Sequence, residues 1–181
     1  DSSPTWSPDA TQVGFSRSGD VVVMDAATGT VVNVTNSATW EGFPVWSPDG
    51  RDIAWLSDES GEYQLTIAEQ TGVTKPRTIA LPSKAFFSAP VWSPDGKQLL
   101  LEDNHLGLWA IDVASGAAAK LDSDTYDDPG RRFDAVWSPD SRRLAYTARV
   151  PEEGRYGTVE GVGPGAEPPR LITTLQYRRD G

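Results

Sequence analysis

The chain has 181 residues, a mass of 19.6 kDa and no cysteine, so it forms one ordinary domain or part of a larger one. Without cysteine it has no disulfide, zinc–thiolate site or cysteine nucleophile, and any histidine-dependent chemistry must use its one histidine, His105. Its 26 acidic and 16 basic residues give a formal net charge of -10, which excludes nucleic acid as an expected partner. Its apolar runs are too short for membrane insertion.

One tetrapeptide, Trp-Ser-Pro-Asp, occurs four times at nearly constant spacing. The copies begin at Trp6, Trp46, Trp92 and Trp137, at intervals of 40, 46 and 45 residues. A period of this length predicts a tandem array of similar supersecondary units.

Short apolar and aromatic runs follow each copy, and Gly, Pro, Asp and Ser bound them, which is typical of strands. No stretch keeps a helical period over ten or more residues. In chain order the runs are Gln12–Ser16, Val21–Asp25, Val31–Thr35, Asp52–Ser57, Tyr63–Ala68, Arg77–Leu81, Gln98–Glu102, Leu106–Asp112, Ala118–Asp122 and Arg143–Thr147. With the run that carries the tryptophan, each complete unit has four strands.

Four-stranded units of this length predict the blades of a β-propeller, because a lone twisted sheet needs neighbours to cover both of its faces. The predicted fold is all-β, a partial β-propeller of about four four-stranded blades over residues 1–150. The blades are expected to start near residues 1, 40, 86 and 131. Residues 151–181 are expected to form the divergent, partly irregular end of the fourth blade.

The Trp-Ser-Pro-Asp turns are predicted to be structural. We expect tryptophan to fill the wedge between blades, proline to set φ, and aspartate to accept backbone amide hydrogen bonds. Gly50 and Gly96 follow two copies and tolerate positive φ, whereas Ala10 and Ser141 stand at that position in the other two.

The repeat resembles that of TolB-like propellers and of the propellers in tricorn-type proteases. Two stretches within residues 1–150 are most similar to tricorn blades, in particular to the later blades of a seven-bladed propeller. They are Phe43–Gly50 with Ser57–Leu65, and Asp103–Asp112 with Lys120–Asp122 and Tyr126.

This resemblance implies a non-catalytic propeller segment of a tricorn-like serine peptidase, which gates peptide access or mediates protein interaction. Its partners would be peptides or proteins, the remaining blades and the catalytic domain of the parent chain. Tricorn catalytic residues lie outside the propellers, so no catalytic, cofactor-binding or metal residue is carried over, and a cytoplasmic location is expected. The alternatives are a TolB-like periplasmic protein-binding propeller and the propeller of a prolyl-oligopeptidase-type enzyme.

The chain departs from the family pattern after Val150. Residues 151–169 hold four prolines and five glycines, a composition that buries little apolar surface. The stretch is either a long surface insertion or a divergent or misread terminus, and Arg170–Thr174 is a candidate last strand.

Four blades in an open arc would expose apolar residues of the first and last units. The TolB and tricorn relatives have six or seven blades, so we expect the natural protein to be longer. The start at Asp1 and the lone methionine, Met24, indicate an excised fragment or a processed chain.

Two segments have partial catalytic or metal-binding patterns. Asp103-Asn104-His105 groups an acid, an amide and an imidazole, while Gly14–Ser18 lacks the second glycine of a nucleophile elbow, so a hairpin turn is favoured over a catalytic site. Asp122–Asp128 resembles a calcium loop but has Asp127 and Phe133 where an EF-hand needs glycine and glutamate. An acidic connector is therefore the favoured interpretation.

Aromatic residues in the segments between blades form the last candidate site. Trp40, Phe86, Phe87 and Tyr126 are placed either to contact a peptide or partner at the channel rim, or to pack over inner strands. Packing is the favoured interpretation.

Overall fold

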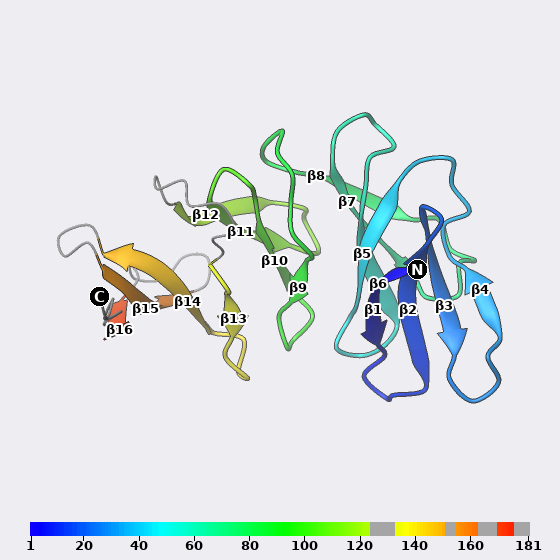
Figure 1. Ribbon diagram of the computed structural model, residues 1–181, viewed down its shortest axis with the longest axis horizontal. Helices are drawn as coiled ribbons and strands as arrows, with labels where there is room; N and C mark the ends of the chain where they lie inside the picture. Colours follow the sequence, from blue (N-terminus) through cyan, green and yellow to red (C-terminus); the bar gives the residue numbers. More distant parts are fainter. Residues whose placement is uncertain (124–132, 151–154, 163–169, 176–181) are drawn as a thin grey trace, which may run out of the picture.

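The computed structural model describes residues 1–123, 133–150, 155–162 and 170–175, and no helix occurs among them. The described chain forms four four-stranded sheets, each with its strands in chain order and antiparallel. Figure 1 shows these sheets following one another from the N-terminal blade at the right to the C-terminal blade at the left. The predicted all-β propeller fold is confirmed.

The strands match the predicted runs within one or two residues at most ends. Blade 1 contains β1 Ser2–Trp6, β2 Gln12–Arg17, β3 Asp20–Asp25 and β4 Val31–Asn33; blade 2 contains β5 Glu41–Trp46, β6 Asp52–Ser57, β7 Gln64–Glu69 and β8 Arg77–Ala80; blade 3 contains β9 Val91–Trp92, β10 Gln98–Glu102, β11 Gly107–Asp112 and β12 Ala118–Ser123; blade 4 contains β13 Val136–Trp137, β14 Arg143–Val150, β15 Arg155–Val162 and β16 Arg170–Leu175.

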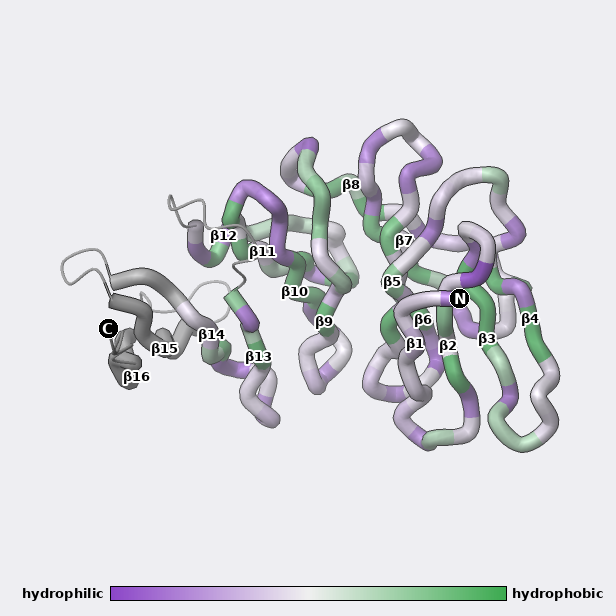
Figure 2. Tube along the Cα trace, viewed as in Figure 1, coloured by the Kyte–Doolittle hydropathy of each residue, from purple (hydrophilic) through white to green (hydrophobic). Residues whose placement is uncertain are grey.

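The core lies in the seams between neighbouring blades, because side chains alternate between the two faces of each strand. In β6, Ile53 and Trp55 pack against blade 1, whereas Ala54 and Leu56 pack against blade 3. Leu99 and Leu101 in β10 likewise belong to the seam with blade 2, and Leu100 to the seam with blade 4. Figure 2 shows the hydrophobic residues concentrated in the central strands of the blades.

The repeated tryptophan makes the same contact at each of the three seams. The indole Nε1 of Trp46 donates to the carbonyl oxygen of Thr5 at 3.3 Å, that of Trp92 to Val45 at 3.2 Å, and that of Trp137 to Val91 at 3.4 Å. In every case the acceptor is the residue that precedes the tryptophan of the previous blade. The predicted wedge role is therefore confirmed, although Trp6 itself is 60% exposed.

The serine of the repeat holds the turn together, a role that the sequence analysis missed. Ser47 Oγ donates to Asp49 Oδ1 at 2.6 Å and accepts from the amide of Asp52 at 3.0 Å, while the amide of Arg51 donates to Asp49 Oδ1 at 3.1 Å. The serine hydroxyl, with the Arg51 amide, lowers the pKa of Asp49. The same bonds recur around Ser7, Ser93 and Ser138.

The residues that replace glycine in two turns keep the left-handed backbone. Ala10 has φ of 59° and Ser141 of 61°, close to the 73° of Gly50 and the 71° of Gly96. The shared Ser–Asp hydrogen bonds hold this conformation, which costs a residue with a Cβ about 1 kcal/mol or more.

The proline- and glycine-rich stretch contains a strand that the sequence analysis did not assign. β15 pairs with β14 over eight positions, and β16 lies where a last strand was considered. The sequence analysis assigned no run to residues 155–162, where β15 forms within the expected end of the fourth blade. Backbone pairing with a neighbouring strand requires neither large side chains nor their burial, and it outweighs the poor strand propensity of Gly157 and Gly161.

Candidate binding site

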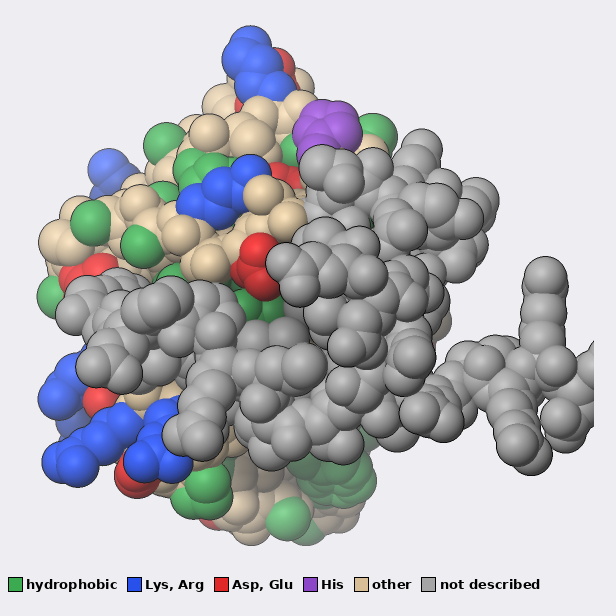
Figure 3. All heavy atoms as spheres, turned by 90° about the vertical axis from the view of Figure 1, so that its left-hand side faces the viewer, with side chains coloured by type: hydrophobic (Ala, Val, Ile, Leu, Met, Phe, Trp, Pro, Cys, Tyr) green, Lys and Arg blue, Asp and Glu red, His purple; other side chains and the backbone are tan. Residues whose placement is uncertain are grey.

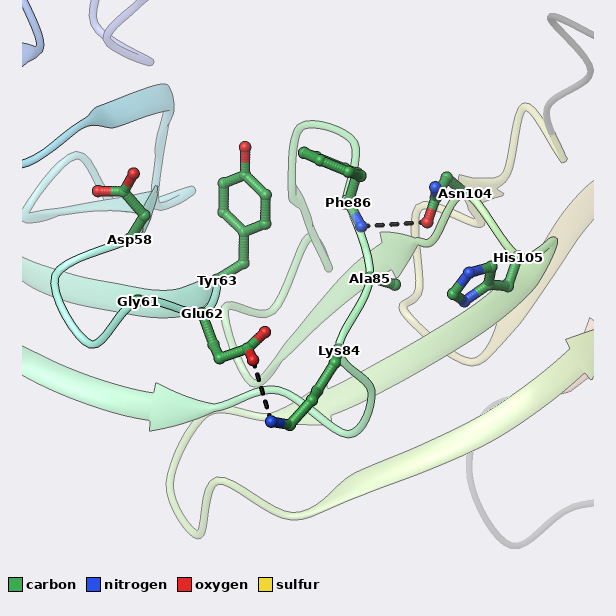
Figure 4. Close-up of a pocket in the computed structure, with 9 residues that line it drawn as sticks. All are labelled: Asp58, Gly61, Glu62, Tyr63, Lys84, Ala85, Phe86, Asn104 and His105. Carbon is green, nitrogen blue, oxygen red and sulfur yellow. Dashed lines mark hydrogen bonds and ion pairs between the residues drawn. The ribbon is translucent and has the colours of Figure 1, made fainter.

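Three loops converge between blades 2 and 3, at the end of the sheets opposite the Trp-Ser-Pro-Asp turns. In an up-and-down sheet, the hairpin between the second and third strands and the connector to the next blade emerge at the same end. Here they are residues 58–63, 81–90 and 103–106. They surround a pocket of about 330 Å³ (Figure 4), lined by Asp58, Gly61, Glu62, Tyr63, Lys84, Ala85, Phe86, Asn104 and His105.

A row of aromatic rings, here called the aromatic ladder, extends from blade 2 into this pocket. Trp40 lies edge-to-face with Phe43 at 5.7 Å and with Tyr63 at 5.5 Å, and Tyr63 lies edge-to-face with Phe86 at 5.6 Å between ring centroids. Phe86 is 67% exposed and Trp40 is 37% exposed. Tyr63 and Phe86 rise side by side from the two walls of the pocket in Figure 4, so their rings form a partly solvated apolar surface.

Two matching backbone clasps position the outer rings of the ladder. The amide of Trp40 donates to Asp58 Oδ1 at 2.8 Å, and the amide of Asp58 donates to the Trp40 carbonyl at 3.2 Å. Phe86 and Asn104 exchange the equivalent pair, at 3.1 and 2.8 Å. An Asp or Asn 18 residues after the aromatic residue therefore fixes its backbone in both blades.

Gly42 makes room for the Trp40 ring. A Cβ at this position would lie 2.4 Å from Trp40 Cζ2, closer than carbon atoms approach without displacement. The backbone of Gly42 needs no positive φ, so its lack of a side chain serves this ring contact. The buried glycine therefore helps to place the Trp40 ring.

The polar lining is unevenly charged. Lys84 Nζ pairs with Glu62 Oε1 at 3.0 Å on an exposed rim, where such a pair contributes little stability. The carboxylate of Asp58 has a backbone amide as its hydrogen-bond donor and no cationic partner within the described residues. The pocket thus combines apolar ring faces with an uncompensated negative charge.

A buried carboxylate lies beside the ladder. Glu41 follows Trp40, is 5% exposed, and its Oε2 has no hydrogen-bond partner in the described part of the chain. Burial raises the pKa of Glu41, and the nearby carboxylates of Asp20 and Glu59 raise it further. This group therefore favours its neutral form more than an ordinary glutamate does.

The Asp103-Asn104-His105 segment forms a hairpin turn, as the favoured interpretation proposed. Asp103 accepts hydrogen bonds from the amides of His105 and Gly107, from Trp109 Nε1 and from Ser83 Oγ. These donors use its carboxylate oxygens, and its contact with His105 is through the backbone. The histidine side chain lies on the surface in Figure 3.

The other partial motif, Gly14–Ser18, does not come near the histidine. Ser16 lies buried within β2 of blade 1, whereas His105 lies in blade 3. A nucleophile elbow requires a serine presented on a sharp turn, which a strand interior does not provide.

The calcium-like segment Asp122–Asp128 lies largely outside the described residues; within them, Asp122 Oδ1 accepts from the amide of Ser123 at 2.7 Å. No group of three or more acidic or histidine side chains suited to a metal ion occurs in the described residues. Nor does the described part contain a helix long and apolar enough to cross a bilayer.

The structure separates the four predicted rim aromatics. Trp40 and Phe86 line one surface, while Phe87 is 5% exposed and packs in the seam between blades 2 and 3, so the packing interpretation holds for it. Tyr126 lies outside the described residues. The sequence analysis missed Tyr63 and Asp58. For Asp58 a signal was available, because an Asp or Asn follows both Trp40 and Phe86 by 18 residues.

Comparison with known proteins identifies the fold and leaves the activity open. No family model and no curated protein matches the chain. Among solved structures it resembles TolB from Acinetobacter baumannii with a TM-score of 0.66 and 19% identity, covering 97% of this chain and 44% of that one. It resembles the tricorn protease with a TM-score of 0.66 and 14% identity, and the match covers 83% of this chain and 14% of the protease. It resembles an oligogalacturonate lyase in complex with manganese with a TM-score of 0.68 and 17% identity, and the match covers 90% of this chain and 48% of the lyase.

The chain therefore has a TolB- and tricorn-like propeller fold. It spans less than half the length of each of these three proteins. Because a TolB protein, a protease and a lyase share this architecture, the fold supports a propeller domain and does not select among parent functions.

Proposed function

We propose that the chain is a non-catalytic propeller segment of a tricorn-like serine peptidase, and that it docks peptides at the pocket between blades 2 and 3. In this proposal the segment acts with further blades and a catalytic domain of a longer parent protein in the cytoplasm. The observation that carries the proposal is the aromatic ladder, which presents partly exposed rings in a pocket with an unpaired carboxylate.

The size and chemistry of the pocket suit a peptide side chain better than a bulky ligand. A volume of about 330 Å³ is at the small end of the range for ligand pockets. The edge-to-face aromatic rings supply apolar contact, and a cation over an aromatic face gains about 0.5 to 2 kcal/mol. With Asp58 at the edge and a net charge of -10, a peptide that carries arginine or lysine is the favoured ligand.

A TolB-like protein-docking module in the periplasm is the second candidate. The likeness to TolB extends over 97% of this chain, against 83% for the tricorn protease. Such a module would bind a folded protein over the loop face, and a short peptide would not reproduce its affinity.

Peptide titration followed by two-dimensional NMR tests the proposal. An acetylated and amidated Gly-Arg-Gly peptide is expected to shift the amide resonances of residues 58–63 and 84–86. The Phe86→Ala variant should lose this response, while Val73→Ala, which removes an exposed apolar side chain elsewhere, should keep it.

The same peptide with citrulline in place of arginine keeps the shape and removes the charge, and it should bind more weakly. The absence of any peptide-dependent shift in the pocket, or an equal response in Phe86→Ala, would contradict peptide docking. Cleavage of a fluorogenic peptide by the purified chain would contradict the non-catalytic role.

A further inference from the structure

A second pocket, of about 250 Å³, adjoins the first on the loop face. Phe43, Phe86 and Phe87 form its apolar wall, and Ser88 lies beside them. Phe86 and Asn104 line both pockets, so the two pockets meet at the backbone clasp that joins these two residues (Figure 4). A volume below the usual range for ligand pockets suits a single side chain.

The carboxylates that line the second pocket already have hydrogen-bond donors. Glu102 Oε2 accepts from the amide of Phe133 at 3.3 Å, and its Oε1 accepts from the amide of Ala135 at 3.4 Å. Both side-chain oxygens of Asp103 also accept hydrogen bonds, as described above. The phenylalanine side chains are therefore the main surface left for a ligand, and the two negative charges disfavour an acidic side chain beside them.

The first pocket offers different chemistry. Its Asp58 carboxylate accepts from one backbone amide and has no cationic partner within the described residues, so it can pair with a cation. The loop face thus places a pocket suited to a basic side chain next to a pocket suited to a neutral apolar one.

The spacing of side chains in an extended peptide fits two such neighbours. Side chains alternate between the two sides of an extended chain, so two that enter pockets on one surface come from positions i and i+2, about 7 Å apart. Side chains in van der Waals contact with opposite sides of the Phe86 ring, each at about 3.5 to 4.0 Å, have nearly the same separation. The ring is 67% exposed, which leaves room for these contacts.

We propose that the ligand of the loop face is an extended peptide in which one residue separates a basic residue from an apolar residue. The basic side chain enters the first pocket beside Asp58, and the apolar side chain enters the second pocket against Phe43 and Phe87, with Phe86 between them. This inference rests on the proposed peptide docking and adds the second side chain to it.

Isothermal titration calorimetry with capped peptides tests the pairing. Gly-Arg-Gly-Gly is the reference, and Gly-Arg-Gly-Leu and Leu-Gly-Arg-Gly carry leucine two positions from arginine on either side. One of these two should bind about fivefold to tenfold more tightly than the reference, because the leucine side chain leaves water. Gly-Arg-Gly-Glu should bind no more tightly than the reference, and neither should Gly-Arg-Leu-Gly, in which leucine is adjacent to arginine.

Ser88 allows the second pocket to be altered separately from the first. Its half-buried side chain lines only the second of the two pockets, and its amide donates to the Glu102 carbonyl at 2.9 Å, a bond that any substitution except proline keeps. Ser88→Leu should fill the second pocket, so the reference peptide keeps its affinity and the leucine peptide loses its advantage. Ser88→Ala is the matched control and should keep both.

The outcomes separate this inference from the proposed function. Equal affinities of the reference and both leucine peptides for the unmodified chain would overturn the second side chain and leave arginine docking in place. A leucine advantage that survives in Ser88→Leu would overturn the second pocket as its site, and tightest binding of Gly-Arg-Leu-Gly would overturn the spacing. The absence of binding by every peptide would overturn the proposed function together with this inference.

Discussion

Replacing Trp46 by alanine is the most direct test of how the blades hold together. The side chain is 7% exposed and packs in the seam with Val21, Val23 and Ile53. A buried tryptophan removes roughly 200 Å² of surface from water, which at about 25 cal/mol per Å² corresponds to about 5 kcal/mol. Because neighbouring side chains relax partly into the space, we expect Trp46→Ala to lower the free energy of unfolding by about 3 to 5 kcal/mol.

Urea unfolding followed by far-ultraviolet circular dichroism measures this loss without relying on tryptophan fluorescence. Trp46→Phe should fall between the alanine variant and the unmodified chain, because it keeps an aromatic ring and loses the hydrogen bond to Thr5. Val73→Ala is the matched control; its side chain is 85% exposed, and we expect a change within about 0.5 kcal/mol. A loss no larger for Trp46→Ala than for this control would refute the seam as the main source of stability.

Two further predictions concern the loop face. Because burial raises the pKa of Glu41 above its unfolded value, the native state binds the proton more tightly, and stability falls as pH rises through the interval between the two values. Glu41→Gln should flatten this dependence and raise stability at neutral pH, measured by urea unfolding from pH 4 to 8; an unchanged profile would exclude Glu41 as the group responsible. Gly42→Ala should displace Trp40 from the ladder and weaken binding of the arginine peptide about threefold to tenfold while the fold is retained. Isothermal titration calorimetry measures this change, and an unaltered affinity would remove Trp40 from the binding surface.

The strands and blades were accessible from sequence because their signals are local. The Trp-Ser-Pro-Asp repeat marks each turn, and short apolar runs at fixed distances from it mark each strand. The exception is β15, in which Gly157, Glu160 and Gly161 interrupt the strand-favouring residues. It forms because β14 offers a row of backbone partners, a contact that composition does not encode.

The candidate site was only partly accessible. Trp40 and Phe86 were recognised as inter-blade aromatics, but Phe87 beside them turned inward into the seam. Adjacent residues of an extended segment point to opposite sides, so one of such a pair is buried and the other exposed, and the neighbouring blade decides which. Tyr63 looked like the start of a strand, and its ring contacts with both Trp40 and Phe86 depend on packing between blades.

The sequence by itself determined the all-β repeat and the turn positions, since both depend on residues close together in the chain, and the recurrence of the tetrapeptide predicted the tryptophan wedge. Only the tertiary structure decided that loops from 58–63, 81–90 and 103–106 meet in one pocket and that Trp6 has no acceptor where its three counterparts have one. The physical reason is that a four-stranded sheet buries its faces against neighbouring sheets, and the tryptophan hydrogen bonds across the seams join residues 41, 47 and 46 positions apart.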